Sequence, residues 1–226
     1  MILRILISLI FPVFAFGGEV LLIGSANTEG QGGIYVSEFA NGTLTEPKRA
    51  FELSWKVAIE LSRDEQTLFV SQSAAKRDGE GELIALRILE GGSLEEINRR
   101  SSGVDHFCAM AESPNGHHLI GASFGLGVVS SFSSSASGEL GKPIDRVELP
   151  RFANGKRELA RAHDVEFSPD GQFVFIADIA NNRIYTFGLD ASTGKLEQVG
   201  FATSEAFVGP RHLILNQTGD VVYVLC

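Results

Sequence analysis

The stretch RAHDVEFSPDGQFVFIADIANNRIYTFGLDASTGKL, residues 161–196, decides the fold of this chain. It contains three short apolar segments of strand composition, and a fourth segment begins at Leu196. The turns between them are Ser168-Pro169-Asp170-Gly171, Asn181-Asn182 and Ser192-Thr193-Gly194. Proline presets the backbone for a turn, and glycine accepts the positive φ that closes one. Four antiparallel strands joined in this way predict one blade of a β-propeller.

The first of these turns recurs along the chain at a nearly constant spacing. Residues 62–65, 113–116, 168–171 and 216–219 each lie between two apolar segments, at intervals of 51, 55 and 48 residues. A period of about 50 residues in strand-rich sequence is typical of propeller blades. A second marker, a glycine two residues before a leucine, precedes the last strand of each repeat: Gly42-Thr43-Leu44, Gly92-Ser93-Leu94, Gly138-Glu139-Leu140 and Gly194-Lys195-Leu196.

The repeats predict an all-β propeller of four-stranded blades, with about four blades present. Inner strands are expected near 57–62, 107–112, 162–167 and 211–216. The first blade is expected to lack its inner strand, and the last to contain only two strands. A propeller closes when strands from both ends of the chain complete one blade. We therefore expect the chain to be incomplete at its C-terminus.

The amino end predicts export. Met1 to Phe16 carries Arg4 and then an apolar run, followed by small residues at a possible cleavage site. This favours a signal peptide over residues 1–17 and a propeller domain over 18–226, secreted or extracytoplasmic and free of the membrane after cleavage. The alternative is that the run forms a buried first strand. A net charge of -9 argues against a nucleic-acid partner.

The cysteines and histidines predict neither a disulfide framework nor a metal site. Cys108 and Cys226 are the two cysteines, and neither a CxxC nor an HExxH pattern occurs. Cys108 lies in an apolar segment, so we expect a small core residue there rather than a reactive thiol.

An ordered set of motifs carries a family resemblance. His163 is followed by Ala177-Asp178, then by Thr193-Gly194-Lys195-Leu196, then by Gly209-Pro210-Arg211-His212. This set resembles the seven-bladed propeller lactonases, which include bacterial 6-phosphogluconolactonase and fungal carboxymuconate cyclase. The resemblance spans nearly all of the predicted domain. It implies seven blades in the whole propeller, no metal or organic cofactor, and a small-molecule lactone or sugar acid as partner.

The resemblance also implies a site at the central channel. The family places there a His, the Arg of the Gly-Pro-Arg-His motif and a Glu soon after it. His163 and Arg211 match the first two, and the Glu would fall just past Cys226. The family's Asn-Tyr-Gly in the third blade is Ser123-Phe124-Gly125 here.

The chemistry of these residues fits opening of a lactone. Arginine binds planar oxyanions through its fork of donors, and histidine exchanges protons near neutral pH. We therefore expect His163 and Arg211 to be catalytic and Arg161, near the channel mouth, to contact substrate. The alternatives are that His163 bonds backbone groups between blades and that Arg211 forms an inter-blade salt bridge. Asp164 and His212 follow these two residues on their strands and should face the other way.

Two functions follow from the sequence. The first is a cofactor-independent lactonase or cyclase that hydrolyses, or reversibly forms, a sugar-acid or muconate lactone. If the chain is incomplete, we expect it to be inactive as it stands. The alternative is a secreted, non-catalytic propeller that binds a ligand or a protein.

Overall fold

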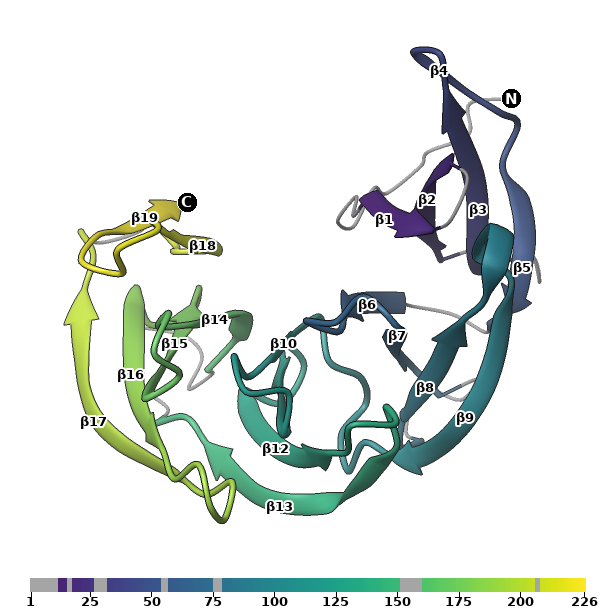
Figure 1. The fold of residues 1–226 in the computed structure, drawn as a ribbon. Helices are drawn as coiled ribbons and strands as arrows, with labels where there is room; N and C mark the ends of the chain where they lie inside the picture. Colours follow the sequence, from purple (N-terminus) through teal and green to yellow (C-terminus); the bar gives the residue numbers. More distant parts are fainter. Residues whose placement is uncertain are drawn as a thin grey trace.

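The computed structural model describes residues 12–15, 18–26, 32–53, 57–74, 79–150, 160–205 and 208–226. Figure 1 shows them as an open arc of five antiparallel sheets, with the first strand of each sheet on the inside of the arc. The prediction of an all-β propeller is confirmed. In this part of the chain, no helix is long and apolar enough to cross a membrane.

Each sheet follows the chain in order. The first contains β1 (Pro12–Ala15), β2 (Gly18–Ser25), β3 (Gly33–Ala40), β4 (Thr43–Leu44) and β5 (Lys48–Glu52), with β4 and β5 both paired to β3. The second contains β6 (Val57–Leu61), β7 (Thr67–Gln72), β8 (Glu82–Ile88), the 3-10 turn η1 (Glu90–Gly92) and β9 (Leu94–Ser101). The third contains β10 (Ala109–Glu112), β11 (His118–Ser123), β12 (Val128–Ser134) and β13 (Leu140–Glu148). The fourth contains β14 (Ala162–Phe167), β15 (Phe173–Asp178), β16 (Arg183–Leu189) and β17 (Leu196–Thr203), and β18 (His212–Leu215) pairs with β19 (Val222–Leu225) in the fifth. The inner strands β6, β10, β14 and β18 lie where the sequence predicts them.

The expectation that the first blade lacks its inner strand is wrong. β1 pairs antiparallel with β2, in register from Pro12 with Leu21 to Ala15 with Gly18. A strand at this position gives backbone partners to an edge of β2 that would otherwise be unpaired. The structure thus follows the alternative interpretation of the apolar run, a first strand, and export stays a prediction.

The recurring turn has one geometry in several blades. Ser168 Oγ donates to Asp170 Oδ1 over 2.6 Å and accepts from the Phe173 backbone N–H over 2.9 Å. Gly171 closes the turn with φ +71°. Ser62 and Ser113 make the equivalent bonds, with Asp64 and Thr67 and with Asn115 and His118. The marker therefore recurs because it satisfies the polar groups of the same tight turn.

The hydrophobic cores lie between neighbouring blades. In β7 every residue is buried, with Leu68 and Val70 in the core shared with the first blade and Phe69 in the core shared with the third. Successive side chains of a strand point to opposite faces, so both faces of a blade must be apolar. A further core joins the third and fourth blades, where Tyr185 and Phe187 are fully buried. This packing fixes β14 against β10, and the site is built on β14.

Candidate active site

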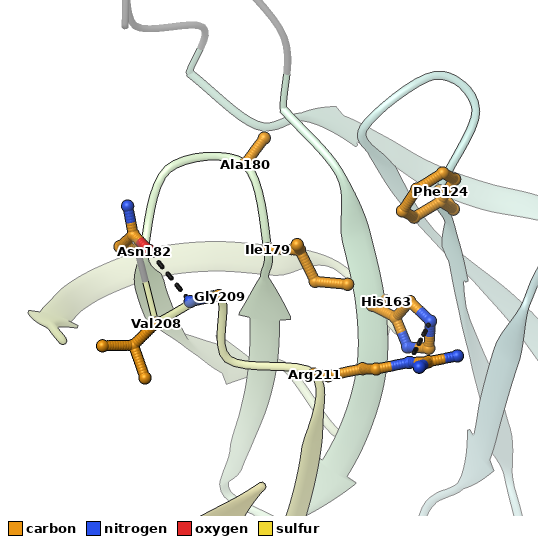
Figure 2. Close-up of a pocket in the computed structure, with 8 residues that line it drawn as sticks. All are labelled: Phe124, His163, Ile179, Ala180, Asn182, Val208, Gly209 and Arg211. Atoms are coloured by element: carbon orange, nitrogen blue, oxygen red, sulfur yellow. Dashed lines mark hydrogen bonds between the residues drawn. The ribbon is translucent and has the colours of Figure 1, made fainter. Parts of the chain in front are cut away.

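A pocket of about 530 Å³ lies where the fourth blade meets the segment leading into β18 (Figure 2). Its walls come from the loop after β11, from β14, from the turn between β15 and β16, and from the residues just before β18. The lining residues are Phe124, His163, Ile179, Ala180, Asn182, Val208, Gly209 and Arg211. The structure therefore brings both residues expected to be catalytic into one pocket.

His163 lies at an irregularity of β14. The register of β14 with β15 passes from Ala162 opposite Asp178 to Asp164 opposite Ala177, so β14 carries one extra residue, His163. A β-bulge of this kind bends the strand and re-aims a side chain, often beside an active site. The bulge, and not simple alternation along the strand, sets the direction of the imidazole.

Arg211 reaches His163 from the next blade. Its Nε donates to His163 Nε2 over 3.2 Å, as the dashed line in Figure 2 marks. Its backbone N–H donates to the Leu225 carbonyl over 2.8 Å, which anchors the residue beside β19. Arg211 does bridge two blades, as one alternative expected, but its partner is an imidazole rather than a carboxylate.

The pair has a defined protonation state. Burial, the Arg211 cation and then His212 lower the pKa of His163 to about 4. Nε2 accepts the arginine N–H, so in the neutral ring the proton is on Nδ1. Nδ1 is buried and makes no hydrogen bond with any residue that the structure describes. Near neutral pH the site therefore combines an uncharged imidazole with a permanent cation.

Residues 20–226 match the family model described as "Lactonase, 7-bladed beta-propeller". The chain belongs to this family. It is 24% identical over 207 residues to the 6-phosphogluconolactonase of Bacillus subtilis, covering 90% of this chain and 58% of that protein. An uncharacterized protein of Staphylococcus epidermidis is 26% identical over 211 residues, covering 90% and 59%.

A solved structure supports the same fold. The structure of the periplasmic gluconolactonase of Pseudomonas aeruginosa superposes with a TM-score of 0.81 and 24% identity, over 91% of this chain and 61% of that one. The lactonase-family chain thus spans about three fifths of the length of the relatives that it matches.

Arg161 of the lactonase-family chain lies beside the pocket. Its guanidinium carbon is 4.3 Å from the centre of the Phe124 ring, a cation–π contact. Phe124 in turn packs edge-to-face on His163, with ring centres 5.8 Å apart. Phe124 is a lining residue and Arg161 is not, so a substrate contact by Arg161 stays a prediction.

Phe124 is a site residue that the sequence did not reveal. Ser123 Oγ, just before it, donates to Asp105 Oδ1 over 2.9 Å. A side chain at Gly125, just after it, would clash with the Asp105 carboxylate. These neighbours fix the loop that presents Phe124. The one available signal was Ser123-Phe124-Gly125 standing where the lactonase family has Asn-Tyr-Gly.

His212 and Asp164 join β14 to β18. His212 packs edge-to-face on His163, with ring centres 5.2 Å apart, so the expectation that His212 faces away from the site residues is wrong. Asp164 Oδ2 accepts from the Leu213 N–H over 2.7 Å and lies 3.7 Å from His212 Nδ1. Asp164 therefore contacts the same neighbouring segment as His163, because the bulge at His163 interrupts the alternation of side chains that the sequence led us to expect.

Cys108 contacts the backbone of the strand that carries His163. It lies just before β10, half-buried, with its Sγ 3.5 Å from the Ala162 carbonyl and 3.4 Å from that of His163. Burial raises the pKa of its thiol to about 12, so the thiol stays protonated. Among the described residues, no group of three or more His, Cys, Asp or Glu side chains is placed to hold a metal ion.

Proposed function

We propose that the protein hydrolyses a lactone of a small hydroxy acid, with Arg211 and His163 as the catalytic residues. The observation that carries the proposal is the 3.2 Å contact between a permanent cation and a neutral imidazole in one pocket. Opening a lactone needs a donor for the developing oxyanion and a group that takes a proton from water. Membership of the lactonase family and the name of the B. subtilis relative support the same reaction.

The geometry suggests the order of events. Arg211 occupies the His163 Nε2 lone pair, and a lactone carbonyl that draws the guanidinium toward itself frees that nitrogen. Water then transfers a proton to Nε2 while its oxygen bonds to the carbonyl carbon, and Arg211 holds the oxyanion. When the ring C–O bond breaks, the imidazolium returns the proton to the leaving alkoxide. The product is the open hydroxy acid.

The electrostatics favour proton transfer late in this sequence. The Arg211 cation is one cause of the lowered pKa of His163, together with burial. An oxyanion held by Arg211 offsets that positive charge, so it raises the basicity of the imidazole as the reaction proceeds. The base is therefore weak before the substrate reacts and stronger in the transition state, where it is needed.

The substrate class within this reaction is a sugar-acid or muconate lactone. The pocket offers Arg211 to a carboxylate or carbonyl oxygen, and Phe124, Ile179 and Val208 give it an apolar wall. A planar or largely carbon ring face would pack against this wall while its oxygens face Arg211.

Export is part of the proposal. The apolar run before Gly17 supports it, as does the periplasmic location of the P. aeruginosa gluconolactonase, whose fold this chain shares. Pairing of β1 with β2 would be lost on cleavage after residue 17. N-terminal sequencing of the protein from its source cells decides between a processed chain and one that retains β1.

One observation favours a second candidate, ligand binding without catalysis. His163 has a pKa of about 4 and its Nε2 is already bonded, so the imidazole is a weak base in the free protein. A site of this kind could hold an anion on Arg211 with His163 serving only to orient it.

The test is hydrolysis of a panel of sugar-acid and muconate lactones, followed by acid release and corrected for spontaneous opening. His163→Ala should lower kcat by about 10²–10⁴-fold, the usual range for a general acid–base group. Arg211→Ala should lower kcat and raise KM. His117→Ala, at an exposed turn residue, is the matched control. Equal rates for the wild type and both site variants would remove the catalytic assignment, and binding of the product acids without turnover would establish the second candidate.

A further inference from the structure

Asn182 stands out among the lining residues because its bonds go to the segment that carries Arg211. It lies in the turn between β15 and β16 with φ +53°, the left-handed region that asparagine tolerates better than most residues. Its Oδ1 accepts from the Gly209 N–H over 3.0 Å, as Figure 2 marks. Its backbone carbonyl accepts from the Ser204 N–H over 2.8 Å. One residue of the fourth blade therefore binds two points of the connection to the fifth.

The geometry beyond Gly209 passes this constraint to Arg211. Gly209 has φ +63° and packs against Ile179, whose Cγ2 lies 3.3 Å from the position that a Cβ would take. Pro210 follows, and its ring fixes φ. Arg211 is therefore only two residues from the bond to Asn182, with little backbone freedom between them. Its own N–H is held by the Leu225 carbonyl.

We propose that Asn182 is a positioning residue that holds the Arg211 guanidinium against His163. The inference rests on the proposed function, for which the Arg211 guanidinium must lie close to both the His163 ring and the substrate oxygen. Two contacts carry it, Asn182 Oδ1 with Gly209 N–H and Arg211 Nε with His163 Nε2. Loss of the first contact releases the connection at Gly209, two residues before Arg211.

The test compares Asn182→Gly with Asn182→Asp. Glycine keeps the positive φ and the backbone bond to Ser204 but removes the Oδ1 acceptor, whereas aspartate keeps an acceptor at the same place. Asn41→Gly is the matched control, since Asn41 has the same φ of +53° and lies in an exposed turn of the first blade, between β3 and β4. If Asn182→Gly does not fold, Asn182→Ser is the second variant, because its hydroxyl oxygen is one bond closer to the backbone than Asn182 Oδ1 and lengthens the contact with the Gly209 N–H.

The first readout is the pKa of His163, measured by NMR titration of its ring protons. In Asn182→Gly it should rise above its value of about 4, because Arg211 moves away, and stay below the ordinary 6.5, because burial remains. Asn182→Asp should keep the Arg211–His163 contact, seen as retention of the Arg211 Nε–H signal. The second readout is lactone turnover, in which Asn182→Gly should lose about 10–100-fold in kcat/KM, as misplaced catalytic groups typically do.

The two readouts separate this inference from the proposed function. An unchanged His163 pKa in folded Asn182→Gly overturns the positioning role, whatever the activity. A shifted pKa in a protein that hydrolyses no lactone supports the positioning role and removes the proposed reaction. An Asn41→Gly variant that shifts the His163 pKa equally would assign the effect to general loosening and also overturn the inference.

Discussion

Arg211 Nε donates to His163 Nε2 over 3.2 Å, so the cation that lines the pocket is bonded to the group expected to act as the base. The bond needs the neutral imidazole, because a protonated ring has no lone pair to offer. Protonation of His163 therefore breaks the hydrogen bond and places two positive charges side by side, which repel each other. This coupling between two blades makes the site sensitive to pH.

The first prediction concerns that sensitivity. The pKa of His163 is lowered from 6.5 to about 4 by burial, by Arg211 and by His212. The unfolded chain therefore binds a proton at pH values where the folded chain does not, and His163 should make stability fall as pH decreases from 6.5 to 4. In His163→Gln this dependence is absent. Urea unfolding at pH 4.5 and 7 should show the variant closer to the wild type at pH 4.5, and an equal gap at both pH values would contradict the assignment.

A second prediction tests how the loop that presents Phe124 is packed. Gly127 has φ +65°, and an added Cβ would clash with Ala160, next to Arg161. Gly103 has a nearly identical φ of +67° with nothing within 4 Å. Gly103→Ala should cost about 1–2 kcal/mol, the penalty of left-handed backbone. Gly127→Ala should cost about 1–3 kcal/mol more, because an overpacked site must shift its neighbours. Equal losses by urea unfolding would show that the third and fourth blades do not pack as described.

The fold could be predicted because its signals are local. The hydrogen bonds of the Ser168 to Gly171 turn lie within the turn itself, so the same short sequence pattern recurs in the second and third blades, at Ser62 and Ser113. The first strand could not be settled, since an apolar run such as residues 12–15 suits both a strand and a signal peptide. His163 and Arg211 were found through motifs, whose order along the chain is visible in sequence.

The remaining site residues depend on tertiary register. The bulge at His163 exists only in the pairing of β14 with β15. Phe124 enters the pocket because Asp105 holds the preceding serine, and Asn182 matters because it meets Gly209, 27 residues away. No local sequence pattern predicts these contacts, because each joins residues from different parts of the chain.

A third prediction separates Arg161 from Arg211. Arg161 lies over Phe124, outside the lining of the pocket, whereas Arg211 lines it. Arg161→Gln should raise KM less than tenfold and leave kcat unchanged, since it loses about 0.5–1 kcal/mol of cation–π contact that steadies Phe124. Arg211→Gln should lower kcat as well. Arg146→Gln, at an exposed residue paired with Glu148, is the control. A loss of kcat in Arg161→Gln comparable with that in Arg211→Gln would place Arg161 among the catalytic residues.

The last prediction concerns a carboxyl group that the reaction does not use. Glu60, on the inner strand β6, accepts from the Glu112 N–H over 3.3 Å. Burial, with help from the neighbouring Glu166 and Glu112, raises the pKa of Glu60 to about 8, although the Glu112 N–H and Arg63 act against it. The folded chain then keeps a proton that the unfolded chain releases above 4.5. Glu60 should therefore make stability fall as pH rises from 4.5 to 8.

Glu60→Gln should remove this fall. Glutamine keeps an oxygen for the Glu112 N–H and cannot ionise, so its advantage over the wild type should grow with pH. We expect the gain in Tm at pH 9 to exceed that at pH 5 by about 5 °C or more. Glu95→Gln is the control, because Glu95 is exposed and paired with Arg87, and it should show no such growth. Should the Glu60→Gln gain be the same at both pH values, Glu60 is ionised in the folded chain throughout, and the inner strands tolerate its charge.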